Sequence, residues 1–183
     1  MLVEKAVEYA RENKIKILGT AVDKNKETIT QATFSEKLMN LFSKDTMKDR
    51  DTYKRGTTPS KFDGVDLKNR PLRNIFIEGD DGKIAKIIFE YFKAVEQRWP
   101  EAWGVVEPEM ILNKSTGFLA LMNLFKDLYV HFDKIGEIIT SEQYKPFFDN
   151  VNLEDSDFNR TKYIPGSGGQ SQLYKDLKLK MGI

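Results

Sequence analysis

Cysteine is absent from this sequence of 183 residues, and histidine occurs only once, as His131. Without cysteine the chain can form no disulfide, no thiolate zinc site and no thiol nucleophile, which fits a reducing environment. No apolar run approaches the ~18 residues that a membrane span requires, and the N-terminus is amphipathic with mixed charge rather than a signal peptide. We therefore expect a cytoplasmic protein that has no membrane partner.

Side chains that usually carry catalysis are few or scattered. His131 has no second histidine or cysteine to share a metal with, and no Ser–His–Asp triad follows from order or spacing, so we interpret it as structural or surface-exposed. Acidic neighbours arise by chance among 28 acidic residues. They occur at Asp80/Asp81, Glu107/Glu109 and Asp155/Asp157. Their turn-like surroundings favour helix capping over Mg²⁺ binding or acid–base chemistry. We predict no catalytic residue, no metal site and no cofactor.

The hydrophobic pattern predicts two long helices. Apolar residues recur at three- and four-residue steps over 83–99 and again over 116–132, the stripe by which a helix packs on a core. Helices this apolar must face each other or a shared partner. Trp99 and Trp103 flank the proline between them, where we expect them to close the core rather than stack on a base. The fold class is therefore a mainly α, compact multi-helix domain built around these two helices.

Shorter patterns complete the prediction of one helical domain over residues 1–183. We expect a helix at 1–13, a small β-hairpin near 15–30, and a helix that starts at a Thr33/Glu36 capping box. Between 44 and 73 hydrophobic residues thin out, which predicts a loop-rich segment with at most one short helix, near 47–55. Further helices are predicted at 133–139, 142–149 (from a Thr140/Gln143 capping box) and 170–181.

Charge is nearly balanced overall, with a net charge of +1, but it is unevenly distributed. The segment 44–73 holds nine basic and five acidic residues. Its densest part places Lys48, Arg50, Lys54 and Arg55 around Tyr53. Such a patch suits nucleic-acid phosphates, whereas the neighbouring aspartates favour i,i+4 ion pairs on a solvated helix. Both interpretations stand on the residues alone.

A glycine-rich segment precedes the last predicted helix. It consists of Gly166, Ser167, Gly168, Gly169, Gln170 and Ser171. Converging backbone N–H groups at a helix start can bind an anion, so these residues are a weak anion-binding candidate. The Lys-Ser/Thr that closes a Walker A motif is missing, and the alternative is a joint that lets the last helix fold back.

Three groups of residues carry a resemblance to a known family. The first is Thr30-Gln31-Ala32-Thr33-Phe34, followed by Lys48-Asp49-Arg50-Asp51 and Lys54-Arg55-Gly56. The second is Phe89–Phe92, followed by Arg98-Trp99-Pro100-Glu101-Ala102-Trp103. The third is Leu112-Asn113-Lys114-Ser115-Thr116-Gly117-Phe118-Leu119-Ala120-Leu121-Met122, followed by the Gly-Ser-Gly turn and Gln172-Leu173-Tyr174.

Together these groups resemble the C-terminal half of DGQHR-domain proteins, over about Ile29 to Leu179. That prokaryotic family includes the B component of DNA phosphorothioation (Dnd) systems and relatives in other DNA-modification and defence loci. The Asp-Gly-Gln-His-Arg string itself is missing, so no activity of the family's N-terminal, ParB-like part transfers to a residue here. The resemblance implies a prokaryotic cytosolic protein, or the C-terminal half of a longer one. It also favours the basic patch, because Arg50 and Arg55 fall within matched motifs.

We therefore expect a non-catalytic accessory or regulatory module of a DNA-modification or defence system, which contacts DNA phosphates through the basic patch. The alternative is a protein–protein docking module for a missing ParB-like domain or another subunit, with an exposed apolar patch on the first long helix or the hairpin. A third interpretation is a Mg²⁺-dependent nuclease or nucleotide hydrolase, which requires carboxylates converging beside the Gly166–Gly169 turn.

Overall fold

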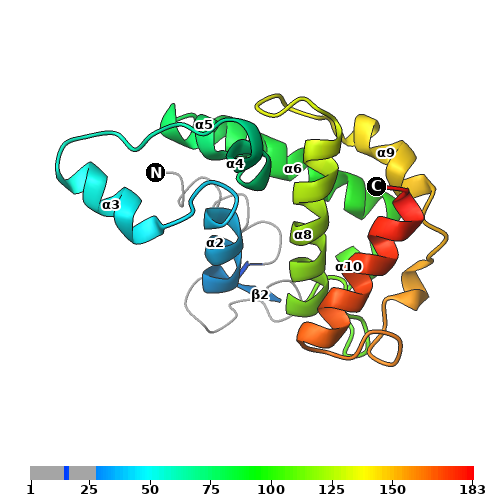
Figure 1. Cartoon of the computed structure of the whole chain (residues 1–183). Coiled ribbons are helices and arrows are strands. Elements are labelled where there is room, and N and C mark those ends of the chain that lie inside the picture. The colour runs from blue at the N-terminus through cyan, green and yellow to red at the C-terminus, as the bar shows by residue number, and fades with distance from the viewer. Residues whose placement is uncertain (1–14, 17–27) are drawn as a thin grey trace.

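Two long helices, α6 (Asp81–Arg98) and α8 (Ser115–His131), lie where the two apolar stripes predict them. They cross at the centre of the molecule (Figure 1). The Tyr91 hydroxyl of α6 donates to the Leu121 carbonyl of α8 at 2.8 Å, and the Tyr91 and Phe125 rings meet edge to face with centroids 5.1 Å apart. The prediction that the two apolar helices face each other is therefore confirmed.

The computed structural model describes residues 15–16 and 28–183 of the chain. Within these ranges the chain forms a mainly α-helical, compact domain, as predicted, with nine α-helices and one 3-10 helix. The helices are α2 (Gln31–Met39), α3 (Thr46–Lys54), α4 (Gly64–Asn69), α5 (Arg73–Ile77), α6, α7 (Pro100–Gly104), α8, α9 (Ser141–Asp149), the 3-10 helix η1 (Asp155–Asp157) and α10 (Ser167–Met181). None of the helices in the described ranges is long and apolar enough to cross a membrane.

Proline and capping residues set the ends of α6 and α9. The Asp80 carboxylate accepts the Lys83 backbone N–H at 3.0 Å at the start of α6. Pro100 cannot continue α6 and instead occupies the first turn of α7, a position that tolerates its missing N–H. α9 begins at the predicted capping box of Thr140 and Gln143.

The core gathers around the central pair. α8 packs along α10 and α6 packs along α9, so each long helix has a second helical neighbour. Both tryptophans are buried as predicted, and the indole N–H of Trp99 donates to the Leu153 carbonyl at 2.8 Å. Glycine permits two close approaches: a Cβ on Gly117 would overlap the Leu112 backbone, and a Cβ on Gly169 would overlap that of Ile164.

The predicted hairpin near 15–30 is wrong in its pairing. The two short strands, β1 (Ile15–Lys16) and β2 (Ile29–Thr30), do pair, but they run parallel, with Ile15 opposite Ile29. A hairpin joins antiparallel strands by a tight turn, whereas parallel strands need a connection of roughly a dozen residues, and 17–28 supply it. The helix predicted at 1–13, and the parts of the predicted strands in 17–27, lie outside the described residues.

Three other segments differ from their predicted structure. The N-cap of α2 is Thr30, whose hydroxyl accepts the Thr33 N–H at 3.1 Å, so the helix starts one turn before the predicted cap. The segment 44–73 holds a second helix, α4, where at most one short helix was predicted, although residues 55–63 and 70–72 lie outside helices. The helix predicted at 133–139 is a series of turns, because the Tyr129 hydroxyl accepts the Gly136 N–H at 3.0 Å and donates to the Glu137 carbonyl at 2.7 Å.

Candidate functional site

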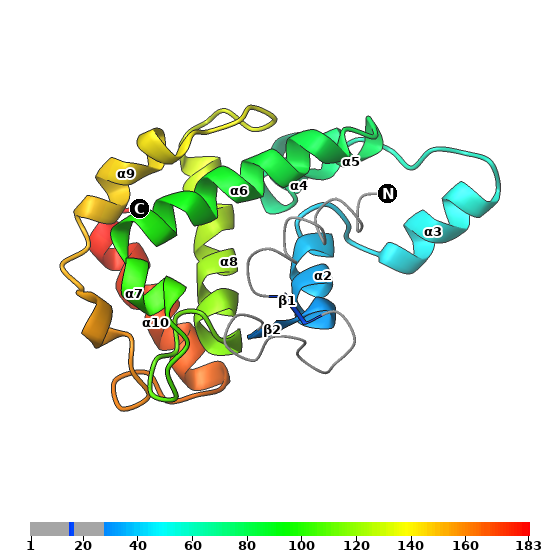
Figure 2. The ribbon, with the colours of Figure 1, turned by 180° about the vertical axis from the view of Figure 1, so that it is seen from behind.

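The α3 arm, defined as residues 44–62, projects from the helical body (Figures 1 and 2). Its helix α3 begins at Asp45, whose carboxylate accepts the Lys48 backbone N–H at 2.9 Å. No residue of α3 is buried, so this helix contributes little to the core. The chain returns to the body through 55–62, and α4 follows.

The arm carries the four cations that the sequence singled out, and all four are exposed. Arg50 pairs with its neighbour Asp51 at 3.1 Å, in an exposed pair whose side chains keep about half of their surface accessible. Lys48, Lys54 and Arg55 form no ion pair with any described carboxylate. The i,i+4 pairs that would have neutralised this surface are therefore not among the described contacts.

Asp49 points the other way, toward the body. Its carboxylate accepts two hydrogen bonds from the Arg73 guanidinium, at 2.5 and 3.1 Å, and a third from the Ser43 hydroxyl at 2.6 Å. Burial alone would raise the pKa of Asp49, but these hydrogen bonds outweigh it and lower the pKa below its ordinary value. Asp49 is thus paired with Arg73 and forms no ion pair with Lys48, Lys54 or Arg55.

Arg73 fixes both ends of the arm to the body. Its side chain is 2% exposed, and besides Asp49 it donates to the Phe42 carbonyl at 3.1 Å and the Ser60 carbonyl at 2.9 Å. The guanidinium also lies 4.5 Å from the centre of the Phe62 ring. One buried arginine therefore holds the chain before α3, α3 itself and the chain after it.

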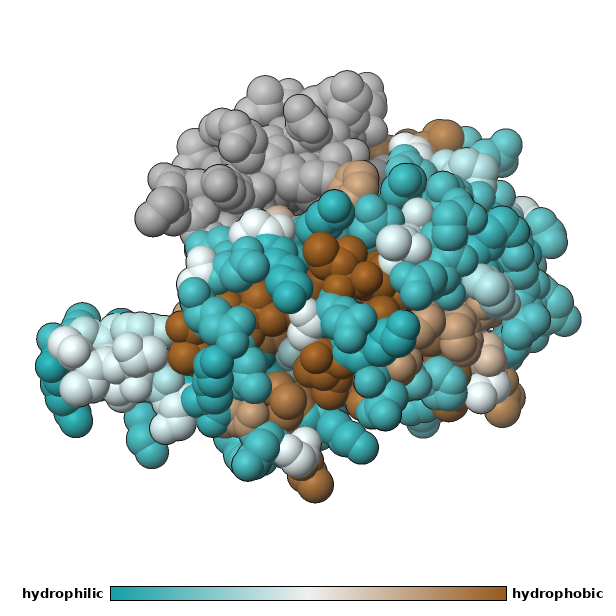
Figure 3. Space-filling view, turned by 90° about the horizontal axis from the view of Figure 1, so that it is seen from above, coloured by the Kyte–Doolittle hydropathy of each residue, from teal (hydrophilic) through white to brown (hydrophobic). Residues whose placement is uncertain are grey.

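An apolar hollow lies where the arm joins the body. Its volume is about 490 Å³, with Met39, Phe42, Tyr53 and Phe76 as its apolar lining and Arg50 and Lys54 at its edge. Seen from above, hydrophobic residues gather at this junction while the arm itself is hydrophilic (Figure 3). A second hollow of about 380 Å³, on which Lys44, Lys48 and Thr58 border, lies between α3 and the returning chain.

The glycine-rich segment is part of a helix rather than a loop. α10 begins at Ser167, three residues before its predicted start, and the N–H of Gly166 donates to the Thr116 hydroxyl at 3.2 Å. Gly166, Ser167, Gly168 and Ser171 are exposed, whereas Gly169 is buried against Ile164. Close packing accounts for Gly169, and anion binding at this helix start stays a prediction.

The remaining candidates occupy separate structural positions. His131 is exposed at the end of α8, with its ring against Phe147. Asp80 caps α6, the Asp155 carboxylate accepts the Ala102 N–H at 2.7 Å, and Asp157 pairs with Lys162 at 2.7 Å. In the part of the chain that the structure describes, no three acidic or histidine side chains gather in a way that could hold a metal ion.

The role of Arg73 was not predicted from the sequence, because its partners lie 13 to 31 residues away along the chain. The only local signal is that Arg73 stands two residues before the apolar pair Ile75 and Phe76. No protein-family profile, curated protein or solved structure matches this chain, so the resemblance to DGQHR-domain proteins stays a prediction.

Proposed function

We propose that this domain contacts nucleic-acid phosphates through the α3 arm, as a non-catalytic accessory or regulatory module of a prokaryotic DNA-modification or defence system. One observation carries the nucleic-acid part: Lys48, Lys54 and Arg55 stand exposed on the projecting arm without a described carboxylate partner, while the half-buried Asp49 is paired with Arg73. The biological setting rests on the resemblance to DGQHR-domain proteins alone.

Exposed, unpaired cations suit this role because phosphate contacts derive most of their free energy from released counterions. A cation already in an ion pair must give up that partner first, which reduces its contribution. Phosphate contacts position a protein on the duplex without reading its sequence, so we expect binding through these cations to show no strong sequence preference. Arg50 contributes less than the other three, since Asp51 neutralises it.

The test is the salt dependence of binding to a short DNA duplex. The triple variant Lys48→Gln, Lys54→Gln, Arg55→Gln removes the three unpaired charges of the arm. Each lost phosphate contact lowers the slope of log K against log salt by about 0.9, so the variant should lose roughly 2 to 3 units of slope.

The matched control is Lys93→Gln, Lys134→Gln, Lys175→Gln, which removes the same charge from exposed positions elsewhere. Its slope should equal that of the parent protein. Equal slopes in both triple variants, or no binding by the parent at low salt, would overturn the proposal.

The apolar hollow supports a second candidate, a protein-docking module. The docking surface was predicted on the first long helix or the hairpin. The hollow lies elsewhere, between α2, α3 and α5. Met39 and Tyr53 keep 38% and 42% of their surface exposed there, which leaves apolar area for a partner chain. Sedimentation and pull-down with other subunits of the same system test this, and Tyr53→Gln, which adds no charge to the arm, should weaken docking while leaving the DNA salt slope intact.

A further inference from the structure

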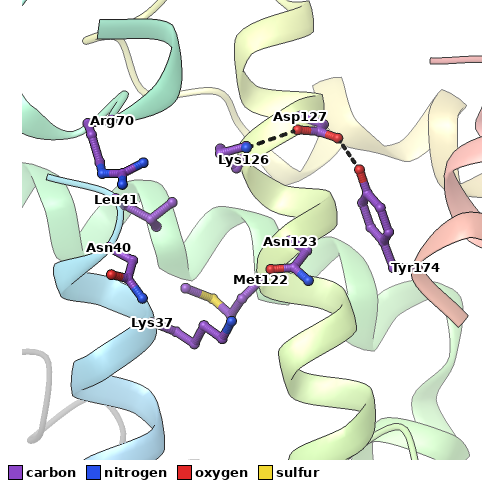
Figure 4. A pocket seen from close by; sticks show the side chains of 9 residues that line it. All are labelled: Lys37, Asn40, Leu41, Arg70, Met122, Asn123, Lys126, Asp127 and Tyr174. Carbon is purple, nitrogen blue, oxygen red and sulfur yellow. Dashed lines mark hydrogen bonds and ion pairs between the residues drawn. The ribbon is translucent and has the colours of Figure 1, made fainter. Parts of the chain in front are cut away.

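A separate pocket of about 270 Å³ lies on the helical body, between α2, the residue that follows α4, α8 and α10 (Figure 4). Three cations line it: Lys37 from α2, Arg70 from the C-cap of α4 and Lys126 from α8. Two side-chain amides, Asn40 and Asn123, line it as well. All three cations are half-buried, whereas the lysines of the arm are exposed.

The single carboxylate of this pocket already has its partners. Asp127 accepts hydrogen bonds from Lys178 Nζ and from the Tyr174 hydroxyl, each at 2.5 Å, and Lys126 Nζ lies 3.7 Å from its other oxygen. Burial would raise the pKa of Asp127, but the hydrogen bonds from Lys178 and Tyr174 outweigh it and lower the pKa. Asp127 thus stays ionised, and its one negative charge faces several cations.

The remaining positive charge has no anion among the described side chains. Lys37 forms no ion pair with a described carboxylate, and Arg70 donates only to neutral carbonyls, those of Ser43 and Asn69, both at 2.9 Å. With Lys126 and Lys178 this makes four cations to one carboxylate around the pocket. Gathering half-buried like charges costs free energy that a bound anion would recover.

We propose that this pocket binds a phosphate group, in the form of a phosphomonoester. A dianion with several acceptor oxygens matches three separated cations and two amide N–H donors better than a single carboxylate does. The pocket is near the small end of the usual ligand range of about 300–1,000 Å³, which suits a phosphate with a small attached group. The proposal rests on different side chains from those of the α3 arm, so either can fail without the other.

The experiment measures the thermal unfolding midpoint and the affinity at constant ionic strength. The probes are inorganic phosphate, a nucleoside 5′-monophosphate, the matching nucleoside, and one oligonucleotide with and without a 5′-phosphate. A ligand that binds only the folded state raises the midpoint, so phosphate-bearing probes at about 10 mM should stabilise the parent while the nucleoside should not. A stronger response to the phosphorylated oligonucleotide identifies a strand end as the source, and a stronger response to the monophosphate identifies a free nucleotide.

The pocket variant is Lys37→Gln, Lys126→Gln, which leaves the Asp127–Lys178 pair in place. It should weaken phosphate binding at least tenfold, whereas Lys93→Gln, Lys134→Gln should bind like the parent. The arm variant Lys48→Gln, Lys54→Gln, Arg55→Gln should also keep the phosphate response, which separates this site from the DNA surface.

Asn123→Asp is a second variant that tests the same pocket if the double variant folds poorly. It places a carboxylate among the cations, which neutralises them and repels a phosphate, so the response of the unfolding midpoint to phosphate should disappear. No stabilisation of the parent by any phosphate-bearing probe, or an undiminished response in Asn123→Asp, would overturn the proposal.

Discussion

The central helices and the α3 arm use their side chains in opposite ways. α6 buries seven residues, including the aromatic residues Tyr91 and Phe92, whereas α3 buries none. The centre is held by apolar area and ring contacts, which charge screening does not weaken, and the arm is held to the body by hydrogen bonds to Arg73. The residues that stabilise the folded domain are therefore different from those that present positive charge to a partner.

The difference also explains why the arm can carry unpaired cations. A helix without a buried face needs no apolar stripe to pack on the core, so its exposed positions can all be polar. Its attachment through a buried, bidentate arginine keeps the arm oriented without covering the charged surface. Five predictions test this division, in order of decreasing effect.

Truncation of Trp99 should produce the largest loss of stability. Its side chain is fully buried, meets Phe148 and Phe158 edge to face, and donates to the Leu153 carbonyl. Trp99→Ala is expected to cost about 3–5 kcal/mol in the free energy of unfolding. Lys54→Ala on the arm should cost under about 0.5 kcal/mol, and denaturant unfolding measures both. Similar costs for the two variants would contradict the division between centre and arm.

Alkaline pH should weaken the centre through its buried tyrosines. Burial raises the pKa of Tyr129 to about 12, above the ordinary 10.0, because the hydroxyl loses water on folding. Above pH 10 the unfolded chain releases this proton first, so stability falls between pH 10 and 12, by about 2–3 kcal/mol for a shift of this size. Stability measured against pH should fall less steeply for Tyr129→Phe.

The matched control for this titration is Tyr53→Phe on the arm, where the ring is exposed in the folded protein. Its pH profile should follow that of the parent. Burial also raises the pKa of Tyr163, so a residual alkaline slope in Tyr129→Phe is expected. An alkaline slope identical in Tyr129→Phe and the parent would contradict the prediction.

Removal of Arg73 should release the arm. Arg73→Met leaves the Asp49 carboxylate without its cation and the Phe42 and Ser60 carbonyls without a donor, a loss of roughly 1–3 kcal/mol. Amide hydrogen exchange should accelerate in α3 far more than in α6. Arg50→Met removes only an exposed pair, so it should change stability by less than about 1 kcal/mol. Uniform acceleration across both helices would instead assign Arg73 to the global core.

The Asp49–Arg73 pair also has a pH signature at the acid end. The folded-state pKa of Asp49 lies below its ordinary value of 3.8, so the pair's contribution is complete above that value and is lost as pH falls through the folded pKa. Asp49→Asn should therefore reduce stability at neutral pH and flatten the acid slope below about pH 4. An unchanged acid slope would mean that other carboxylates dominate it.

Two tyrosine hydroxyls give the smallest and most specific effect. The Tyr91 hydroxyl donates to Leu121, whereas the Tyr144 hydroxyl is buried without a hydrogen-bond partner among the described groups. Tyr91→Phe should cost about 1 kcal/mol, while Tyr144→Phe should be neutral or slightly stabilising because it removes an unsatisfied polar group. Denaturant unfolding of the two single variants checks this, and a larger loss in Tyr144→Phe would contradict it.

Much of the fold was predictable because its signals are local. The apolar stripes of α6 and α8, the Asp80 cap and the Thr140 capping box each lie within a few residues. Local signals also misled the prediction of a helix start. Thr30 and Thr33 can each serve as an N-cap, and the structure uses Thr30. Starting at Thr30 makes Phe34 the fourth residue of the helix instead of the first, and its ring stacks on Phe118 of α8 with centroids 5.9 Å apart. That tertiary contact is not readable from the cap pattern.

The candidate sites were predictable only where charge alone defines them. The arm's cations stand next to one another in sequence, so their density was visible. The partner of Asp49 was not, because Arg73 lies 24 residues away. The pocket was missed altogether, since Lys37, Arg70 and Lys126 come from distant elements that only folding brings together.

Gly117 bears on what shared sequence can mean for this protein. Its place in the Thr116-Gly117-Phe118 run is dictated by the backbone that it touches, and any larger side chain would collide with Leu112. A protein that adopts the same helix junction must therefore keep this glycine, whatever reaction or partner it serves. A homologue that shares this tripeptide would therefore share the fold at the helix junction. Its function would have to be inferred from its surface residues instead.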